Sequence, residues 1–387
     1  MKEGWEYKKL KEVGLTQTGT TPSKQIKSFY GGDIPFIRPA ELNIDQNGGI
    51  LYESELKLTE EGALKARVIK ENSVLMCCIG SVGKTGFTLR SVTCNQQINT
   101  ITPYDNYNPK FVYYALISPS FQQEVTKIAN SAKATLPIIS KGKWEVLSIP
   151  IPPLSEQQSI VNYLDSAFAK IDAMKANAEK SLNEAKALFQ ASLKEMLEPK
   201  EGWEEKTIND VAVFRNGVAH EKDIEEGGGY IVINSKFVAT EGSIKKYTNK
   251  QLSPLYTNEI VMVMSDVPKG KTLAKCYIIE CDDKYSLNQR ICAFKSKGLD
   301  MKFLYYILNR NPHLLKYDNG ENQTNLRKKQ IIECPVAYPP QKKEQQSIVD
   351  YLDSLKSKVD RLQANFEKIS QECDALKQAL LREVFEG

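Results

Sequence analysis

The chain has 387 residues, long enough for two or three domains, and 41% of them are hydrophobic, which supports real cores. No stretch approaches the roughly 20 apolar residues that span a bilayer, and no signal-like apolar segment follows Lys8 and Lys9. The eight cysteines contain no C-x-x-C pair, which favours reduced thiols in a cytoplasmic protein over a metal site.

The net charge of +4 is unevenly distributed along the chain. Residues 1–154 carry 18 basic and 14 acidic side chains, and residues 200–340 carry 21 and 18. Residues 155–199 and 341–387 are slightly acidic instead. Any polyanion is therefore expected on residues 1–154 and 200–340.

The first part, residues 1–154, has the pattern of a mixed α/β domain. Residues 74–79 form an apolar run before Gly80 that predicts a buried strand. Residues 97–101 alternate like a half-buried strand, which Pro103 should stop. Residues 111–117 predict a short buried helix. Three prolines in residues 149–154 predict an extended lead-in, because each removes an N–H donor.

A long helix is predicted from Ser155, where Ser155 and Gln158 have capping-box spacing. No glycine or proline interrupts it before Pro199, so it would be about 43 residues and about 65 Å long. Apolar residues recur at alternating three- and four-residue steps, the pattern of a coiled-coil seam. The expected seam residues are Val161, Leu164, Phe168, Ile171, Leu182 and Phe189.

The second half of the chain repeats the first in order. Residues 156–166 return as residues 344–354 with one difference, and residues 2–6 return as residues 200–204. Between these nearly identical segments the two copies have diverged. Such a chain can carry two different recognition surfaces on one repeated frame.

The last helix has a cleaner seam than the first. We predict an α+β chain: two related mixed α/β domains, residues 1–154 and 200–343, separated by a long antiparallel two-helix coiled coil (155–199 and 344–387) in a pseudo-twofold arrangement. The alternative is that each helix packs back on its own domain. The second set of expected seam residues is Leu352, Leu355, Val359, Leu362, Phe366, Ile369, Leu376 and Leu380.

The chemistry-bearing motifs favour binding over catalysis. Residues 80–85 suggest a phosphate loop. That loop needs a glycine five positions before its second glycine, but Cys78 occupies this position, and Ser265 occupies it in the second copy. No hydrolase, metalloprotease or cofactor-loop motif is present, and His220 and His313 have no partner pattern. We therefore predict neither a catalytic residue nor a metal ligand.

Polar loops in both copies are candidates for contact with nucleic acid. Amides and guanidinium groups read base edges, whereas lysines mainly hold phosphates. The expected DNA-binding residues are Arg38, Lys84, Thr85, Lys133, Thr135, Lys236, Ser265, Lys269, Lys271, Arg290, Asn322, Gln323, Thr324, Asn325, Arg327 and Lys328.

A set of short motifs recurs in the same order in both halves of the chain. They are Gly4-Trp5 and Gly202-Trp203, residues 80–86, Asn95-Gln96-Gln97 and Asn288-Gln289-Arg290, residues 151–158, and the repeated segments 156–165 and 344–353. With these motifs the chain resembles, over its full length, the specificity subunit of a Type I restriction-modification system.

The resemblance implies two target recognition domains, each reading one half of a split, asymmetric site in double-stranded DNA, with the helices as spacer. It implies a subunit without activity of its own that binds two methyltransferase (M) subunits and restriction (R) subunits, and no membrane. S-adenosylmethionine, ATP and magnesium are expected in those partners, and no cofactor in this chain. Residues 266–270 and 338–343 depart from the family pattern, so base contacts there cannot be transferred.

Three alternatives remain open from the residues alone. A related split-site system would have a partner in which methylase and nuclease are fused. A scaffold with two protein-binding heads on a coiled coil would not bind DNA, and salt-dependent DNA binding distinguishes it. The third is an enzyme whose site has no recognisable motif.

Overall fold

The computed structural model describes residues 4–42, 49–131, 135–267, 270–318, 320 and 322–387. The chain divides into two compact units: residues 1–179 with 365–387 (unit 1), and residues 180–364 (unit 2). Two helices of 43 and 45 residues, α6 (Leu154–Met196) and α12 (Lys342–Glu386), each contribute one end to either unit. Among the described residues, no helix has both the length and the apolarity needed to cross a bilayer.

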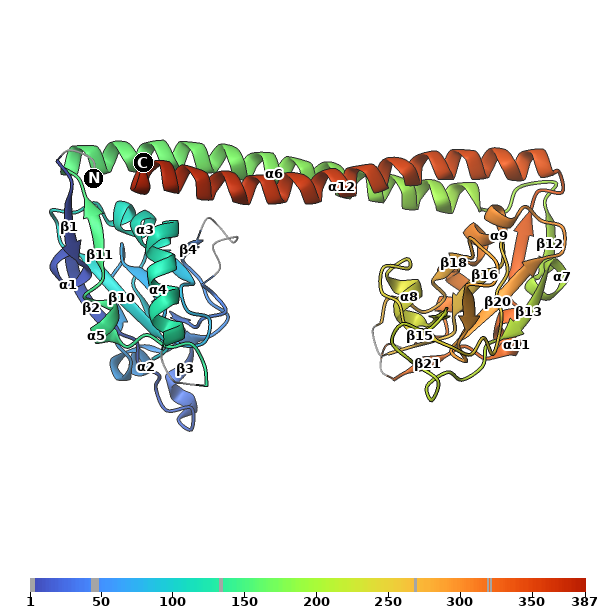
Figure 1. Cartoon of the computed structure of the whole chain (residues 1–387), viewed down its shortest axis with the longest axis horizontal. Coiled ribbons are helices and arrows are strands. Elements are labelled where there is room, and N and C mark those ends of the chain that lie inside the picture. Colours follow the sequence, from blue (N-terminus) through green and yellow to red (C-terminus); the bar gives the residue numbers. More distant parts are fainter. Residues whose placement is uncertain (1–3, 43–48, 132–134, 268–269, 319, 321) are drawn as a thin grey trace. The chain divides into compact units, whose positions relative to one another are not determined.

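Unit 1 contains a five-stranded sheet in the order β2-β10-β7-β8-β4, a four-stranded sheet β5-β3-β9-β6 and the pair β1-β11 (Figure 1). The strands are β1 (Glu6–Lys9), β2 (Gly14–Thr18), β3 (Tyr30–Ile37), β4 (Ile50–Leu51), β5 (Lys57–Leu58), β6 (Val68–Ile69), β7 (Val74–Cys77), β8 (Thr85–Thr88), β9 (Val92–Cys94), β10 (Ile98–Pro103) and β11 (Ser148–Ile151). The shorter helices are α1 (Leu10–Val13), η1 (Lys27–Phe29), α2 (Glu60–Lys65), α3 (Pro109–Ile117), α4 (Pro119–Ser131) and α5 (Lys141–Trp144).

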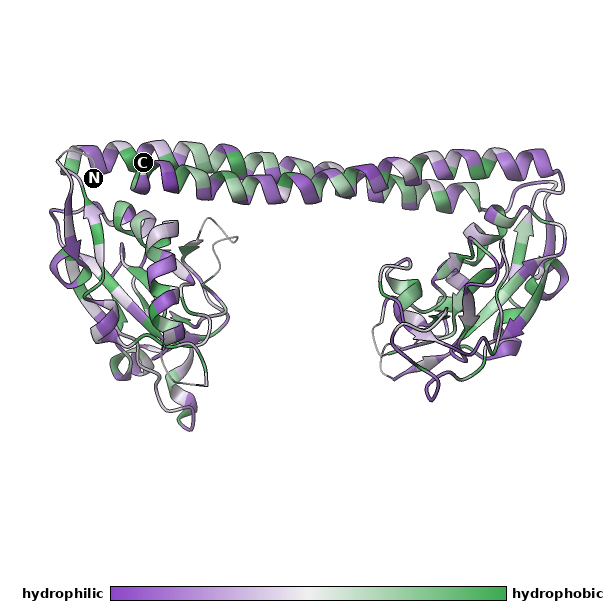
Figure 2. Ribbon diagram, viewed as in Figure 1, coloured by the Kyte–Doolittle hydropathy of each residue, from purple (hydrophilic) through white to green (hydrophobic). Residues whose placement is uncertain are grey.

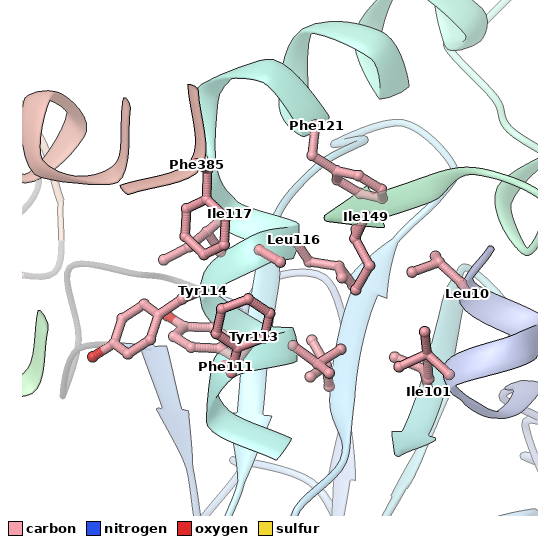
Figure 3. Close-up of a cluster of buried hydrophobic side chains, with 14 of the residues drawn as sticks. Leu10, Ile101, Phe111, Tyr113, Tyr114, Leu116, Ile117, Phe121, Ile149 and Phe385 are labelled. Carbon is pink, nitrogen blue, oxygen red and sulfur yellow. The ribbon is translucent and has the colours of Figure 1, made fainter. Parts of the chain in front are cut away.

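The core of unit 1 is built around α3. Asn108 caps this helix by accepting from the amides of Lys110 and Phe111, and Pro109 occupies its first turn. All residues from Phe111 to Ile117 are buried. Phe385 of α12 packs on Phe111 with ring centroids 5.5 Å apart (Figure 3).

Unit 2 repeats this architecture with a four-stranded sheet β13-β20-β16-β18, a three-stranded sheet β15-β14-β19 and the pairs β12-β22 and β17-β21. The strands are β12 (Glu204–Thr207), β13 (Ala212–Asn216), β14 (Tyr230–Ile233), β15 (Tyr247–Thr248), β16 (Ile260–Val263), β17 (Ser265–Asp266), β18 (Cys276–Ile278), β19 (Tyr285–Leu287), β20 (Ile291–Ser296), β21 (Thr324–Asn325) and β22 (Pro335–Tyr338). The shorter helices are α7 (Ile208–Val211), α8 (Ser235–Ala239), α9 (Met301–Leu308), α10 (Pro312–Leu315) and α11 (Lys328–Ile332).

The strand predicted at residues 74–79, the helix at residues 111–117 and the long helix are confirmed as β7, α3 and α6. Two further local predictions are confirmed. Strand β10 ends at Pro103, although Ile98–Ile101 are all buried, so this strand is not half-buried as predicted. Residues 148–151 are extended and form the strand β11, antiparallel to β1.

The predicted capping box at Ser155 was wrong. Helix α6 begins at Leu154, and the carbonyl of Pro153 accepts from the amides of Glu156 and Gln157. Ser155 therefore lies inside the first turn, where its carbonyl accepts from the Ser159 hydroxyl. The start of the helix is satisfied by backbone groups of the proline-rich lead-in instead.

The repeated segment attaches each long helix to its own domain. In unit 1, the Trp5 indole donates to Glu156 (3.0 Å), and the buried Gln157 accepts from the Asn108 amide and donates to the Pro152 carbonyl (both 2.9 Å). Lys110 forms an ion pair of 2.7 Å with Asp165, which also accepts from the Tyr114 hydroxyl.

Unit 2 makes the same contacts one by one. The Trp203 indole donates to Glu344 (3.2 Å), and Gln345 joins the Asp300 amide to the Pro339 carbonyl. The Tyr306 hydroxyl donates to Asp353 at 2.6 Å, and Lys302 pairs with the same carboxylate. Internal contacts thus account for the repeated Glu-Gln-x₇-Asp residues.

Within each unit α6 and α12 run antiparallel side by side. In unit 1, Lys377 bonds Asp172 at 2.5 Å and Lys175 bonds Asp374 at 3.4 Å. In unit 2, Lys186 bonds Gln363 at 2.8 Å. Both helices alternate polar and apolar bands, whereas many strands inside the units are apolar (Figure 2).

The seam residues fall into three groups. Those buried are Val161, Leu164, Ile171, Leu182 and Leu352. Those partly buried are Phe168, Phe189, Leu355, Val359, Leu362, Phe366, Ile369 and Leu380. Leu376 is 47% exposed, so it is not covered by the neighbouring helix. Val161 and Leu164 pack on the core of unit 1, and Leu352 on that of unit 2, so the alternative of helices docked on their own domains is realised at these ends.

Candidate nucleic-acid interface

Four chain segments converge at one edge of unit 1. The backbone amide of Asn95 donates to the Ile37 carbonyl (3.1 Å), and the backbone amide of Cys78 donates to the backbone carbonyl of Gln97 (2.7 Å). The Ile139 amide donates to the Cys78 carbonyl, and the Gly80 amide donates to the Pro137 carbonyl, each at 2.9 Å. The ends of β3, β9 and β7 and the segment around residue 138 are therefore held together by backbone hydrogen bonds.

Unit 2 assembles the matching segments in the same way. The backbone amide of Asn288 donates to the Ile233 carbonyl (3.2 Å). The Met264 amide donates to the Arg290 carbonyl (3.0 Å), and the Leu326 amide donates to the Met264 carbonyl (2.8 Å). The two polar loops singled out in the sequence thus meet: β17 and β21 pair antiparallel, with Ser265 opposite Asn325. Within unit 2, β21 lies on the side away from α6 and α12 (Figure 1).

The side chains at this edge of unit 2 are polar and mostly exposed. Gln323 donates to the Ser265 hydroxyl at 2.8 Å, and it lies 3.5 Å from the Asn325 side chain. Ser265 is buried and engaged in this bond, so it supports the neighbouring amides instead of facing outward. Asn322, Gln323, Asn325, Arg327, Lys328, Lys271 and Arg290 are exposed, and Thr324 is partly buried, its hydroxyl donating to Asp318.

Two cations here have defined neighbours. The Lys328 ammonium lies 5.7 Å from the ring centroid of Phe214, close enough for a cation–π contact. The Arg290 guanidinium is exposed next to Glu221, whose carboxylate accepts from Gln289 at 3.1 Å. These side chains could reach base edges and phosphates.

A single carboxylate organises the turn that follows β17. Asp266 accepts from the amides of Val267 (2.9 Å), Thr272 (2.6 Å) and Leu273 (3.1 Å). Partial burial opposes ionisation, but these donors hold the pKa of Asp266 below its ordinary value of 3.8. Lys271 projects from this turn, and the predicted Lys269 lies outside the described residues.

In unit 1 the predicted residues are only partly brought together. Lys84 and Thr135 are exposed on the two segments that meet beside Gly80. Thr85 is buried and its hydroxyl donates to the Gly83 carbonyl (2.8 Å), so it belongs to the turn itself. Lys133 lies outside the described residues.

Arg38 and Lys236 follow β3 and β14, at the same edge in each unit. Two carboxylates engage the Arg38 guanidinium, Glu41 at 2.6 Å and Glu55 at 2.7 Å, and these bonds raise its pKa further. A guanidinium neutralised in this way is a weak anchor for phosphate. Lys236 is exposed on α8.

Three further amide side chains lie at this edge besides those predicted from the sequence: Gln96, Gln97 and Gln289. The Asn95 side chain donates to Gln97 (2.9 Å), and Gln96 accepts from the Thr21 hydroxyl. Their place in the repeated Asn-Gln motif, immediately before a predicted strand, was the available signal.

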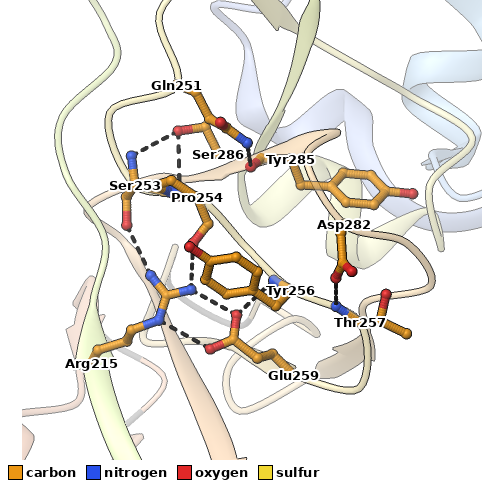
Figure 4. A network of polar contacts seen from close by, with 10 residues as sticks. All are labelled: Arg215, Gln251, Ser253, Pro254, Tyr256, Thr257, Glu259, Asp282, Tyr285 and Ser286. Atoms are coloured by element: carbon orange, nitrogen blue, oxygen red, sulfur yellow. Dashed lines mark hydrogen bonds and ion pairs between the residues drawn. The ribbon is translucent and has the colours of Figure 1, made fainter.

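A buried polar network supports the edge in unit 2 (Figure 4). Arg215 donates to both carboxylate oxygens of Glu259, at 3.1 and 2.7 Å, and to the Ser253 hydroxyl at 3.1 Å. The Ser253 amide donates to the hydroxyl of Ser286, which also bonds the fully buried His220 at 2.8 Å. This chain of bonds ends two residues before Asn288, so it fixes the strand that delivers Asn288 and Arg290.

Comparisons with known proteins agree with this architecture. The family model of the Type I restriction modification DNA specificity domain matches residues 2–184 and 200–371. The HindI specificity subunit of Haemophilus influenzae is 35% identical over 34% of this chain and 29% of its own length. The MjaVIII specificity subunit of Methanocaldococcus jannaschii is 23% identical over 95% of this chain and 90% of its own.

This chain matches only 29% to 40% of the full length of three curated relatives. They are the HindI subunit, the MjaIX specificity subunit of Methanocaldococcus jannaschii and the EcoR124I/EcoR124II specificity subunit of Escherichia coli. Among solved structures, a chain from work on complex assembly and conformational transition of the type I R-M system superimposes with a TM-score of 0.77. It is 18% identical, over 99% of this chain and 98% of that one, which establishes likeness of fold.

Proposed function

The chain belongs to the family of the Type I restriction modification DNA specificity domain, and from this premise we propose that it selects the DNA site of a Type I restriction-modification complex. Each unit reads one half of a bipartite, asymmetric site in double-stranded DNA. The chain docks methyltransferase and restriction subunits, which supply the chemistry.

One observation carries this proposal. The same backbone hydrogen bonds assemble the same polar edge in both units, but different side chains occupy it. Gln97 in unit 1 stands where Arg290 stands in unit 2, and an amide and a guanidinium pair with different base edges. Two unlike readers on one chain suit two unlike half-sites, whereas a symmetric dimer would require a palindrome.

The chain's own residues hold and position DNA and carry out no step of methyl transfer or cleavage. We propose that S-adenosylmethionine, ATP and magnesium bind in the partner subunits. The methyltransferase must extrude its target base from the stack, which requires DNA held in a fixed register. The exposed amides and cations at the two polar edges would provide that register.

Substitution of Arg290 tests the reading of bases. In the assembled methyltransferase complex, Arg290→Ala should cost about 1–3 kcal/mol at one position of one half-site and relax the base chosen there. Lys328→Ala, at a phosphate-type contact, should weaken binding to all sequences alike and make it less salt-dependent. Methylation-sensitive sequencing of host DNA reports the site for each variant.

The other half-site serves as the control in the same experiment. It must remain unchanged in Arg290→Ala, because the unit 1 edge is intact. A change in both half-sites, or in neither, would contradict the assignment of one unit to one half.

Docking of the methyltransferase is proposed on the exposed part of the repeated segment. Glu156, Gln157 and Asp165 are explained by internal contacts, as are their counterparts in unit 2. Tyr163 and Tyr351 are repeated in the same way, yet Tyr163 is 48% exposed and Tyr351 is 45% exposed. Identical exposed residues in both copies suit two copies of one partner.

Tyr163→Ala combined with Tyr351→Ala should prevent co-purification of the methyltransferase subunit, while each single change should leave one subunit bound. Met174→Ala, at a residue of α6 that is 59% exposed and lies outside the repeat, is the matched control. Normal subunit stoichiometry in the double variant would rule out this surface.

A further inference from the structure

Unit 2 leaves open a sheet edge that unit 1 covers. In unit 1 the outermost strand β4 runs parallel to β8, with Ile50 opposite Phe87. Strand β18 takes the place of β8 in unit 2, because Cys276 pairs with Met262 as Thr85 pairs with Met76. In the part of the chain that the structure describes, β18 ends its sheet and no strand pairs with its other side.

Chain length explains the difference. The connection from β3 to β5 comprises residues 38–56 and includes β4. The matching connection from β14 to β15 comprises only residues 234–246 and contains α8. Unit 2 therefore has no counterpart of β4 in this connection.

A groove of about 340 Å³ follows this edge, lined by Ile278, Glu241, Glu280, Lys302, Tyr305 and Asp353 among others. Tyr305 is only partly buried, whereas Tyr113, its counterpart under β4, is 2% exposed. The Ile279 amide bonds Glu259 of the sheet (2.9 Å), so by strand alternation the amide of Ile278 faces the groove. The neighbouring Cys276 amide, on the same side, is capped by the Asn309 side chain (3.0 Å).

We propose that this groove binds an extended peptide segment of a partner protein, which adds a strand parallel to β18 as β4 does to β8. Main-chain groups of an exposed sheet edge select an extended backbone. Edges that must stay free usually carry charges, whereas β18 reads Cys-Tyr-Ile. The proposal is independent of DNA reading.

The groove also specifies side chains of the segment. Tyr305 and Ile278 offer an apolar floor for one or two aliphatic residues, as β4 contributes Ile50 and Leu51 in unit 1. A strand parallel to β18 leaves the groove at Glu280, and Asp282 and Asp283 follow it, all exposed. Lys302 is already paired with Asp353. A basic residue should therefore follow the aliphatic ones.

The probe is a fluorescein-labelled peptide that carries the sequence of residues 48–52, Gly-Gly-Ile-Leu-Tyr, followed by two lysines. Fluorescence anisotropy with the full chain should show saturable binding, and hydrogen exchange should show protection of the Ile278 amide. A peptide with proline in place of isoleucine should bind about tenfold more weakly, because proline cannot donate to the edge.

Two variants of the protein keep the test independent of folding. Ile278→Pro removes the edge amide, and Glu280→Lys reverses an exposed charge without touching the core; each should weaken binding about tenfold. Glu226→Lys makes the same charge change at another exposed residue of unit 2 and should leave affinity unchanged. Equal affinity for both peptides, or for Glu280→Lys and wild type, would overturn the proposal.

Self-association would also overturn it. If the wild-type chain dimerises in sedimentation and Ile278→Pro abolishes the dimer, the occupant of the edge is a second copy of this chain.

Discussion

Single side chains at the polar edges are committed to neighbours that residue type alone does not reveal. Arg38 is neutralised by Glu41 and by Glu55, which is 17 residues away, and the Thr85 hydroxyl is used by its own turn. By contrast, Arg290 and Lys328 remain exposed. The sequence could name the polar loops, because they stand out by composition, but it could not tell which charges are already compensated.

The turn after β17 should loosen in acid. The pKa of Asp266 is depressed in the folded chain, so its stabilising effect is complete above the ordinary value of 3.8 and is lost as the pH falls through its lower folded pKa. Amide exchange of Thr272 and Leu273, corrected for intrinsic rates, should accelerate below about pH 4.

Asp266→Asn should show the loosened turn at pH 7, with exchange at these amides faster by about tenfold, or ~1.4 kcal/mol. Asp283→Asn, at an exposed carboxylate of the same unit, is the control and should change nothing. Unaltered protection in Asp266→Asn would mean that other bonds hold the turn.

At the scale of elements, periodicity identified both long helices, because a strict apolar stripe on a 3.5-residue period is typical of paired helices. It could not reveal that their ends enter the domain cores. Leu381, Val384 and Phe385 are buried in the core of unit 1, although the predicted seam stopped at Leu380. These residues depart from the two-in-seven pattern, since they face a domain and a helix at once.

Phe385→Ala should therefore destabilise unit 1 by about 3–5 kcal/mol, the usual cost of emptying a buried aromatic site. Hydrogen exchange in α3 measures the effect, because Phe385 packs on Phe111. Leu376→Ala on the same helix, at a residue that is 47% exposed, should leave α3 unchanged. Equal effects of the two substitutions would show that the helix end does not support unit 1.

For the whole molecule, the repeat predicted two related domains and paired helices, and the observed fold agrees. What the repeat could not show is where the copies differ in architecture. The absence of a fifth strand in the main sheet of unit 2, among its described residues, follows from a shorter connection. That connection lies inside the diverged part, where comparison of the copies has no identical residues to guide it.

If the long helices set the spacing of the half-sites, shortening both helices must change the number of unread base pairs between the half-sites, the gap. Deleting residues 173–179 of α6 and 370–376 of α12 removes one heptad from each helix within unit 1, about 10 Å of helix, or roughly three base pairs. Sequencing of the methylated site should give a shorter gap with both half-sites unchanged. Altered half-site bases would refute a spacer role.

The amide of Ser120 donates to the Glu386 carboxylate, 266 residues further along the chain. On the ribosome, the N-terminal domain of a protein generally folds while the remainder is still being made. Here the contact between Phe111 of α3 and Phe385 can form only after α12 emerges. While the second unit is being translated, the nascent first unit therefore lacks the part of its core that α12 supplies.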